Sequence, residues 1–284
     1  SSFNDERNLQ HVRGGTGWSM NGGRMQLQRV NYDEIATEYD RRYQVSPMKP
    51  VGAALRTVLG GLGAARVLEV GCGTGHWLAE LAAPGREMFG LDASMGMLRA
   101  AQAKVASSAY LAHGQAEHLP FRAASFEFVY VVNALHHFTD RQRFIDEARR
   151  VLAPGGALAI IGMTPPRRED WYVYEYFDGT YEIDIARFAS RETLRDWLTA
   201  AGFVRVESRI IHEINEERVG RAVLDDVFVE KRSTSQLALL SEEAYQIGIR
   251  RLWAAIARAE ATGRPVTFRS RLQIVMLLAH VPMR

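Results

Sequence analysis

The sequence predicts an α/β fold with a doubly wound, mostly parallel sheet of seven strands and helices on both of its faces. Short apolar runs alternate with segments of helical periodicity from residue 66 onward, a rhythm typical of parallel strands joined by helices. A glycine-rich turn follows the first apolar run, as in many strand–turn–helix ligand sites. The 284 residues are enough for one such domain with additions to it.

The first half of the chain supplies the clearest strands and helix starts. Ser94 is expected to cap the helix after the second strand, and Thr139 with Gln142 forms a capping box before the helix after the fourth. The turn at 154–156, Pro-Gly-Gly, leads into the fifth strand. The first five expected strands are residues 66–70, 87–92, 109–114, 126–132 and 157–163.

The regular alternation fails after the fifth strand. The next segment is dense in aromatic and acidic side chains and has no clear period, so an irregular cap insertion is expected there. Ser190 then caps a helix, and a sixth strand follows at 203–211. The chain beyond that strand is mostly helical in pattern up to residue 264, and residues 272–281 form the last strand. We therefore expect cap insertions after the fifth and sixth strands.

These assignments divide the chain into consecutive segments. We expect a flexible tail or a remnant of cloning at 1–24, N-terminal helices at 25–60, an α/β core at 61–163, an aromatic-rich cap insertion at 164–189, a return to the core at 190–211, a helical cap at 212–264 and the last core strand at 265–284. Met25 can be a natural start, and whether residues 1–24 are native stays open.

The composition is that of an ordinary globular protein. Hydrophobic residues make up 47% of the chain and the formal net charge is +2, so no basic excess favours a nucleic-acid partner. A single cysteine excludes a disulfide or a cysteine-rich metal centre within the chain, and it favours a cytoplasmic location. No apolar run is long enough to span a membrane, so no membrane partner is expected. No metal site is expected either.

The turn after the first strand carries the strongest chemical signal. It reads Glu-Val-Gly-Cys-Gly-Thr-Gly over residues 69–75, and His76 stands where a dinucleotide site has its third glycine. Glu69 would repel a pyrophosphate, whereas it suits the cationic amino and sulfonium groups of a small zwitterion. Asp92 lies 21 residues after Gly71, at the end of the second strand, where a carboxylate can accept both hydroxyls of a ribose.

Five ordered motifs resemble those of class I S-adenosylmethionine-dependent methyltransferases. The glycine turn and the segment Leu-Asp-Ala-Ser-Met at 91–95 look like the first two cofactor motifs of that family. GQAEHLPF at 114–121 and NALHHF at 133–138 resemble the next two, and NYDEIATEYD at 31–40 resembles the N-terminal lid helix. The resemblance implies a Rossmann-like sheet that binds S-adenosyl-L-methionine and releases S-adenosyl-L-homocysteine.

The same resemblance implies a set of cofactor-binding residues. The family often has Asp at the position of Gln115, so the adenine contact is in question here, although Gln can still accept a hydrogen bond. Glu69 could instead shape the loop, and Met97 could belong to the core. The expected contacts are Tyr32, Tyr39, Glu69, Gly71, Cys72, Gly73, Gly75, Asp92, Ala93, Met97, Gln115, Ala116, Glu117, Asn133 and His137.

Catalytic residues are harder to assign, because methyl transfer needs a general base only when the acceptor must lose a proton. His136 and His137 are candidates, since they follow the fourth strand at the sheet edge where ligands gather. They could equally shape the pocket without moving a proton. Tyr172 and Glu175 of the aromatic insertion are further candidates. Cys72 is not expected to act as a nucleophile, because methyl transfer needs no covalent intermediate.

The sequence thus predicts a methyltransferase that modifies O, N or C of a small organic acceptor, aromatic or related to natural products. The aromatic side chains at 171–181 would line its pocket, although any of them could belong to the core instead. The alternatives are a methyltransferase acting on RNA or protein, a nicotinamide-dependent oxidoreductase, and a non-catalytic binding module with this fold. A monomer or a homodimer is expected, with no nucleic-acid partner.

Overall fold

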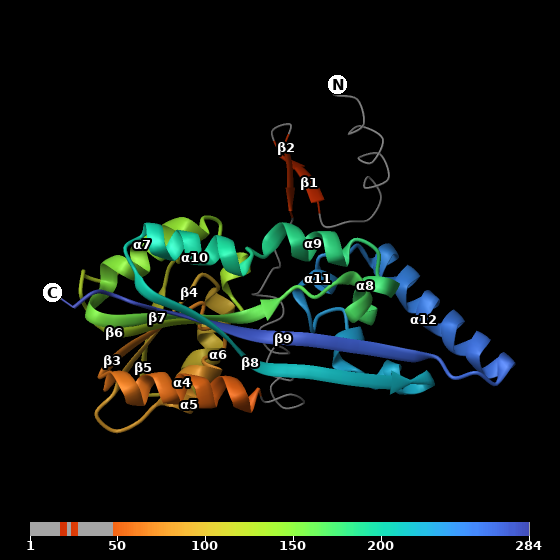
Figure 1. Cartoon of the computed structure of the whole chain (residues 1–284), viewed down its shortest axis with the longest axis horizontal. Coiled ribbons are helices and arrows are strands. Elements are labelled where there is room, and N and C mark those ends of the chain that lie inside the picture. The colour runs from red at the N-terminus through yellow and green to blue at the C-terminus, as the bar shows by residue number, and fades with distance from the viewer. Residues whose placement is uncertain (1–17, 22–23, 28–47, 284) are drawn as a thin grey trace. The chain divides into compact units, whose positions relative to one another are not determined.

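The computed structural model describes residues 18–21, 24–27 and 48–283, and these fall into two compact units (Figure 1). The first, called the core unit below, comprises residues 31–164, 189–213 and 273–284. The second unit comprises residues 1–30, 165–188 and 214–272. The chain therefore passes between the units several times, and each unit contains segments that are distant in the sequence.

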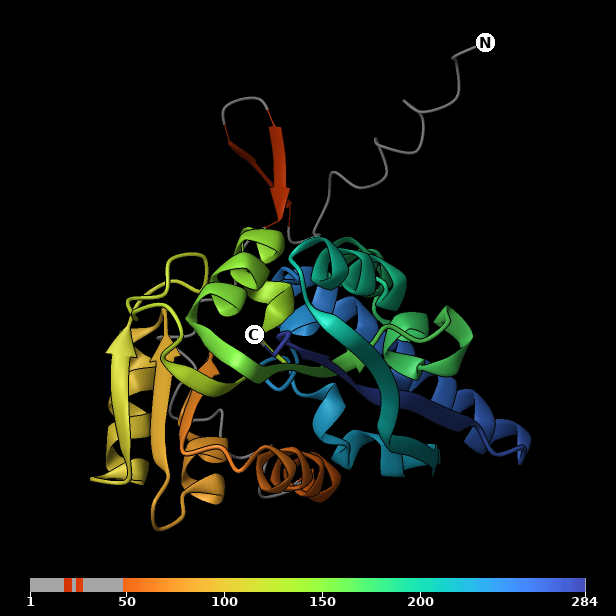
Figure 2. The ribbon, with the colours of Figure 1, turned by 60° about the vertical axis from the view of Figure 1, so that its left-hand side comes forward.

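A seven-stranded sheet runs in the order β5-β4-β3-β6-β7-β9-β8. Pairing is parallel from β5 through β7 and antiparallel between β7 and β9. Figure 2 shows β5, β4 and β3 side by side at its left. The predicted doubly wound, mostly parallel sheet is confirmed. The strands are β3 (Arg66–Val70), β4 (Glu87–Asp92), β5 (Ala109–His113), β6 (Phe126–Val132), β7 (Leu152–Thr164), β8 (Val204–Val219) and β9 (Thr267–His280).

Helices of the core unit cover both faces of this sheet. Figure 1 shows α7 and α10 on one face and α4 and α5 on the other. A short 3-10 helix, η1 (Leu135–His137), follows β6. The helices are α4 (Lys49–Leu62), α5 (His76–Leu81), α6 (Met95–Val105), α7 (Arg141–Val151) and α10 (Arg191–Ala200).

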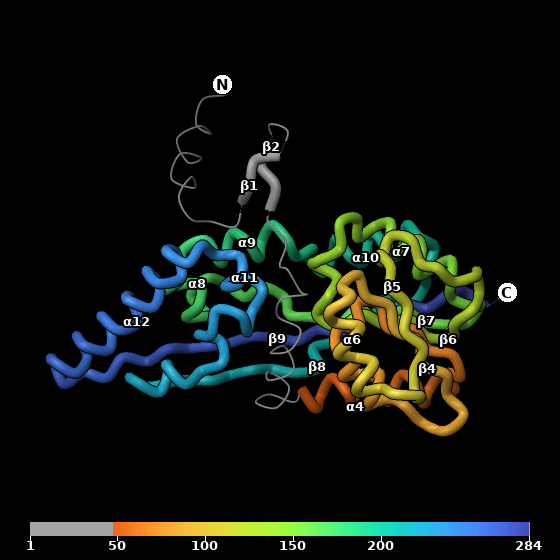
Figure 3. The backbone as a smooth tube through the Cα atoms, turned by 180° about the vertical axis from the view of Figure 1, so that it is seen from behind, coloured from red at the N-terminus to blue at the C-terminus, as the bar shows by residue number. Residues whose placement is uncertain are grey.

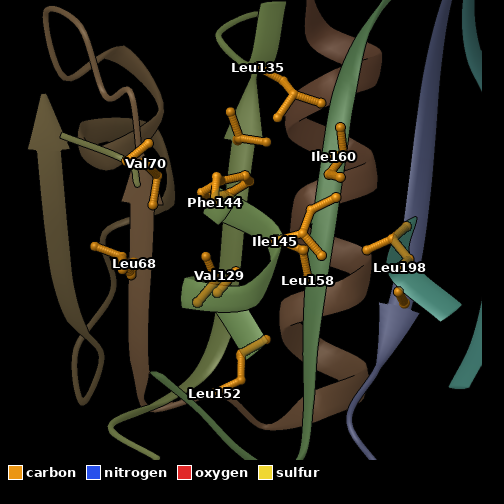
Figure 4. Packing of buried hydrophobic residues seen from close by; sticks show 14 of the residues in the cluster. Leu68, Val70, Val129, Leu135, Phe144, Ile145, Leu152, Leu158, Ile160 and Leu198 are labelled. Atoms are coloured by element: carbon orange, nitrogen blue, oxygen red, sulfur yellow. The ribbon is translucent and has the colours of Figure 1, made fainter. Parts of the chain in front are cut away.

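Alternate side chains of each central strand enter opposite cores. On β6, Tyr130 lies in the core under α4, α5 and α6, whereas its neighbour Val129 lies in the core under α7 and α10. Figure 4 shows the core under α7 and α10, where Ile145 of α7 lies beside Leu158 of β7. Burial on both faces explains the continuous apolar runs in the sequence, since neither face of a central strand meets water.

The helices of the core unit begin at the predicted capping residues, except that the cap of α7 lies one residue later than expected. The hydroxyls of Ser94 and Ser190 accept hydrogen bonds from the main-chain N–H three residues later, at 3.1 and 3.0 Å. Both predicted caps are confirmed. Before α7 the cap is Asp140, not Thr139, and its carboxylate accepts the corresponding bond at 2.9 Å. The prediction was wrong by one residue because aspartate serves this position as well as threonine does.

The second unit contains short helices and one long helix. α8 contacts α9 and α12, and α11 contacts α9 (Figure 3). Helices as short as α8 show no clear period, which explains why the sequence around them is hard to interpret. None of the described helices is both long and apolar enough to cross a membrane. The elements are β1 (Trp18–Asn21), β2 (Arg24–Leu27), η2 (Arg168–Asp170), α8 (Tyr172–Tyr176), α9 (Thr180–Arg187), η3 (Gly220–Asp225), η4 (Val227–Val229), α11 (Ser235–Ala238) and α12 (Glu242–Thr262).

The sixth strand is longer than the sequence suggests. β8 continues to residue 219, whereas the sequence predicts its end at 211 and a helical pattern from 212. The added segment is rich in glutamate and arginine, a composition that an exposed helix shares. An edge strand tolerates such charges, because one of its sides has no neighbouring strand. Within the second unit, the charges also pair across strands, since Arg269 of β9 donates to Glu217 at 3.1 Å.

A short antiparallel hairpin stands near the N-terminus. β1 pairs with β2 so that residue 18 lies opposite residue 27. The sequence predicts a flexible tail over 1–24, so strand structure at 18–21 differs from that expectation.

Candidate active site

The glycine-rich loop joins β3 to α5 at the carboxyl edge of the sheet. Gly71, Gly73 and Gly75 have φ angles of 72°, 52° and 74°, a region that other residues rarely adopt. A Cβ atom at Gly71 would also lie only 2.6 Å from the Cβ of Ala134. The loop therefore needs glycine both for its backbone conformation and for its close packing.

The Asp92 carboxylate, at the end of β4, holds this loop in place. One oxygen accepts a hydrogen bond from the Gly73 N–H at 2.8 Å, and the other accepts from the Ser94 N–H at 2.9 Å. A carboxylate oxygen can accept more than one hydrogen bond, so anchoring the loop does not exclude a contact with a ligand. The half-buried Asp92 therefore fits the predicted role of accepting two ribose hydroxyls while it anchors the loop.

Glu69 is a buried carboxyl group immediately before the loop, with 1% of its surface exposed. Its Oε2 accepts a hydrogen bond from the Tyr130 hydroxyl at 3.1 Å. Burial raises the pKa of the Glu69 carboxyl well above its ordinary value. The Tyr130 hydrogen bond opposes this shift, and the charge of Asp92 adds to it. A cationic ligand group near Glu69 would favour its ionised form, so the site suits the zwitterion expected from the sequence.

Cys72 lies inside the same loop and is buried. Burial raises the pKa of its thiol well above the ordinary value, and the charges of Glu69 and Asp92 add to the shift. The thiol is therefore protonated at neutral pH, and only a thiolate is a strong nucleophile. This agrees with the expectation that Cys72 does not act as a nucleophile.

The third motif contains an anchor that the sequence did not reveal. The Glu117 carboxylate accepts hydrogen bonds from the main-chain N–H groups of Thr139 and Asp140, at 2.6 and 3.1 Å. It thus joins the third motif to the segment that begins α7. Beside it, Ala116 is buried and Gln115 is exposed. The contacts of these residues with an adenine ring stay a prediction, whereas the anchoring role of Glu117 is a new finding.

A second carboxylate strengthens the same segment. Glu147 of α7 accepts a hydrogen bond from the Leu119 N–H at 2.8 Å, and Arg150 donates to it at 2.7 Å. The hydrogen bond from Arg150 lowers the pKa of the Glu147 carboxyl. Arg150 also donates to the Leu119 carbonyl at 2.9 Å. Both anchors join residues more than twenty positions apart, so no local sequence pattern reveals them.

The fourth motif begins with a strained backbone at the end of β6. Asn133 has a φ angle of 50°, which asparagine tolerates better than most residues do, and its N–H donates to the Ile161 carbonyl at 2.8 Å. Such conformations are frequent at functional sites. His136 and His137 follow on η1, half-buried, with ring centroids 3.9 Å apart. Their position at the carboxyl edge agrees with a ligand site, and their chemical role stays a prediction.

The remaining predicted cofactor contacts occupy different settings. Met97 is buried in α6, which suits the core alternative that the sequence left open. Ala93 is exposed, and its carbonyl lies 3.1 Å from the His113 Nε2. Tyr32 and Tyr39 lie outside the described residues.

The catalytic candidates Tyr172 and Glu175 belong to the second unit. Tyr172 is 2% exposed, and burial raises the pKa of its hydroxyl, with a further contribution from the charge of Asp226. Glu175 is exposed on α8. These positions give Tyr172 a place in the packed interior of the second unit, and a catalytic role for either residue stays a prediction.

Most aromatic rings of the insertion pack inside the second unit. Trp171 and Tyr174 meet edge to face with centroids 4.9 Å apart, and Phe177 stacks on Tyr245 at 5.7 Å. Trp171, Tyr172, Tyr174 and Phe177 are all buried, so the alternative of core packing holds for these four side chains. The abundance of aromatic residues is therefore not a sign of an aromatic acceptor.

Sequence relatives identify the family of this chain. Residues 68–160 match the methyltransferase domain family. Demethylmenaquinone methyltransferases of Clavibacter sepedonicus and Lactiplantibacillus plantarum are each 31% identical to the chain, over 209 and 210 residues. The matches cover 63% and 62% of this chain, and 82% and 86% of the two relatives.

Solved structures with little sequence identity share the fold. A SAM-dependent methyltransferase of Thermotoga maritima has a TM-score of 0.53 at 20% identity, covering 88% of this chain and 97% of its own. Phosphoethanolamine N-methyltransferase 2 of Haemonchus contortus, in complex with phosphomonomethylethanolamine and S-adenosylhomocysteine, has a TM-score of 0.53 at 18% identity. That match covers 88% of this chain and 58% of the other.

The geometry and the relatives lead to the same assignment. The glycine loop, the Asp92 carboxylate and the buried Glu69 lie together at the carboxyl edge of the sheet, where the sequence predicts contacts with a ribose and a cationic methionine half. The cofactor is therefore S-adenosyl-L-methionine, and the protein is an enzyme. The chain belongs to the class I S-adenosylmethionine-dependent methyltransferases.

Proposed function

We propose that this enzyme methylates a small organic acceptor, and that a quinone-type ring is the first acceptor class to test. One observation carries the proposal: 31% identity along 82% and 86% of two demethylmenaquinone methyltransferases. Relatedness over so much of their length favours an acceptor of similar size. It gives no support to RNA, protein or nicotinamide chemistry.

The core unit would act mainly by binding and orientation. S-adenosylmethionine supplies a methyl group on a sulfonium, whose leaving group is a neutral thioether. Asp92 would hold the ribose, and Glu69 would face the cationic methionine half. The glycine loop brings the backbone close to the ligand, since no side chain stands at Gly71 or Gly73. Alignment of this kind can lower a barrier by about 7–11 kcal/mol in favourable cases.

A general base is needed only if the accepting atom carries a proton. We propose His136 or His137 for this role, because both lie on η1 at the carboxyl edge of the sheet. Histidine titrates near neutral pH and can accept a proton there. Tyr172 and Glu175 are weaker candidates, since one is buried and the other belongs to an exposed turn of α8.

We propose that acceptor choice depends on residues outside 68–160, the segment that matches the methyltransferase domain family, and the second unit supplies none of that segment. Residues shared by many methyltransferases cannot by themselves choose among acceptors. We also propose a cytoplasmic enzyme, supported by its single cysteine, and a monomer or homodimer, which light scattering after size exclusion would distinguish.

The proposal is tested by methyl transfer from isotopically labelled S-adenosylmethionine. Separate reactions would contain a chemically reduced naphthoquinone, a catechol, a primary amine, total RNA and a protein extract. We expect label in the reduced naphthoquinone and none with Asp92→Ala. Label in the catechol or the amine alone would overturn the quinone class and keep a small acceptor. Label confined to RNA or protein would overturn the small-molecule proposal itself.

A further inference from the structure

A buried tyrosine–glutamate pair lies beside the glycine loop. Glu69 opens the first cofactor motif, whereas Tyr130 belongs to none of the motifs. Glu69 of β3 and Tyr130 of β6 stand directly opposite each other in the register of two parallel strands. Both side chains are buried, with 1% and 0% of their surface exposed. The Tyr130 ring stacks on Phe128, with centroids 5.5 Å apart, so packing fixes the direction of its hydroxyl. The hydroxyl donates to Glu69 at 3.1 Å.

Another buried carboxylate shows what this pair lacks. Asp184, in the second unit, accepts a hydrogen bond from the Tyr174 hydroxyl at 2.8 Å and another from Arg187 at 2.7 Å. Its negative charge is therefore paired inside the fold. Glu69 has the tyrosine, but within the described part of the chain it forms no ion pair with a lysine, arginine or histidine. A buried carboxylate without a cation is expensive to ionise unless a ligand brings the charge.

The charged surroundings of the pair come from several elements. Asp92 of β4 disfavours the ionised form of Glu69, while the main chain at Leu78 of α5 and the ammonium of Lys104 of α6 favour it. Lys104 donates its hydrogen bond to the Thr74 hydroxyl, at 3.2 Å. The positive charge of Arg86 lowers the pKa of the Tyr130 hydroxyl, and the protonated Cys72 thiol adds no charge. The Tyr130 hydrogen bond is the strongest of the influences that favour ionised Glu69.

We propose that Tyr130 is a positioning residue, which aims the Glu69 carboxylate and keeps it ready to pair with the cationic methionine half of S-adenosylmethionine. The inference rests on the proposed role of Glu69 in cofactor binding. Wherever the Glu69 carboxyl still holds its proton, an arriving cationic ligand displaces that proton to solvent and pairs with the carboxylate. Cofactor binding therefore releases protons, and Tyr130 lowers the pH at which this occurs.

Isothermal titration calorimetry of the whole protein tests this proposal. S-adenosylmethionine is titrated into wild type, Tyr130→Phe, Glu69→Gln and the control Tyr110→Phe, which makes the same chemical change on the exposed strand β5. Affinity is measured from about pH 6 to about pH 9, in pairs of buffers with different ionisation enthalpies, so that proton release is counted. Circular dichroism verifies that each variant is folded.

We expect Tyr130→Phe to weaken binding about tenfold near neutral pH, the usual effect of removing a hydrogen bond to a charged group. The loss should shrink as the pH rises, because Glu69 then ionises without the help of the hydroxyl. Glu69→Gln should release fewer protons than wild type, and its remaining pH dependence reports the cofactor's own titration. Tyr110→Phe should bind as wild type does.

Two results would overturn the positioning role while leaving the cofactor assignment intact. One is a Tyr130→Phe variant that binds as wild type does at every pH. The other is a loss of affinity that is equal at every pH, which indicates a packing defect. If Tyr130→Phe does not fold, equal proton release by wild type and Glu69→Gln would still refute the proposal. Failure of wild type to bind S-adenosylmethionine would refute the cofactor site, and this inference with it.

Discussion

Glu69 of the core unit and Asp184 of the second unit are both buried carboxylates, but their surroundings neutralise them in different ways. In the second unit, Arg187 pairs with Asp184 at 2.7 Å, and Arg218 pairs with Asp226 at 2.8 Å. In the core unit, Glu69 has a tyrosine hydroxyl as its partner and no ion pair within the described residues. The comparison separates two uses of a buried acid. Asp184, which has its own cation, belongs to the architecture, whereas Glu69, which has none in the described part of the chain, is proposed above to pair with the charge of a ligand.

The largest loss of stability is expected from breaking the ion pair between Arg187 and Asp184. Arg187→Ala leaves Asp184 buried and uncompensated, which costs about 3–5 kcal/mol in typical cases. Urea unfolding measures the loss, and hydrogen exchange should locate it in α9 and α11, because Arg187 also donates to Ser235 at 3.1 Å. The exposed ion pair between Arg168 and Glu182 supplies the control. Arg168→Ala should cost less than about 1 kcal/mol. Equal effects of the two variants would contradict the comparison.

A smaller effect is expected where the core unit meets the cofactor. Gly71→Ala combines a positive φ angle with a Cβ contact of 2.6 Å, so a loss of about 2–4 kcal/mol in unfolding free energy is expected, together with weaker cofactor binding. Gly85→Ala is the matched control, since its φ angle is 77° but no atom lies within 4 Å of the added Cβ. If both variants lose the same amount, strain alone explains Gly71 and close packing does not.

The unpaired acid predicts a pH dependence of the cofactor-free protein. The pKa of Glu69 in the folded state lies well above its ordinary value of 4.5, so the folded chain keeps a proton that the unfolded chain loses. Stability should therefore fall as the pH rises from 4.5 toward the folded pKa, by at most about 1.4 kcal/mol per pH unit. Glu69→Gln should flatten this slope in urea unfolding. A slope unchanged in the variant would assign the effect to another group.

The smallest effect is expected at Tyr172. Its hydroxyl is buried in the second unit beside the Asp226 carboxylate, and it makes no hydrogen bond of ordinary geometry with a described residue. Tyr172→Phe should therefore change the free energy of unfolding by no more than about 1 kcal/mol. Measurement of kcat on the same sample tests the catalytic role suggested by the sequence. A fall in kcat beyond about tenfold in a stably folded variant would support that role and contradict the packing interpretation.

The sheet was largely predictable because its strands are buried on both faces. The first two strands were expected at 66–70 and 87–92, and β3 and β4 have these bounds. The end of β8 was not predictable, since charges on an edge strand look like those on an exposed helix. Asp140 replaced Thr139 as a cap because both residue types accept the same bond. The local sequence thus predicts which helices and strands form, but it does not predict where all of them begin and end.

The candidate site divides in the same way. Glycines and acids inside one motif, such as Gly71 and Asp92, could be assigned from their spacing. The anchor made by Glu117 and the hydrogen bond from Tyr130 to Glu69 join segments that only the folded sheet brings together. One signal was available: a tyrosine within the apolar run of β6 has a hydroxyl that needs a partner once it is buried. The partner itself was not readable from the sequence.

Cys72 gives the enzyme a built-in probe of its own cofactor loop. It is the only cysteine in the chain, and 5% of its surface is exposed. An alkylating reagent can reach the thiol only when the loop opens, so the rate of labelling under native conditions measures how often that happens. A bound ligand that closes the loop should slow the labelling, in a single-site assay that needs no mutation and no knowledge of the acceptor.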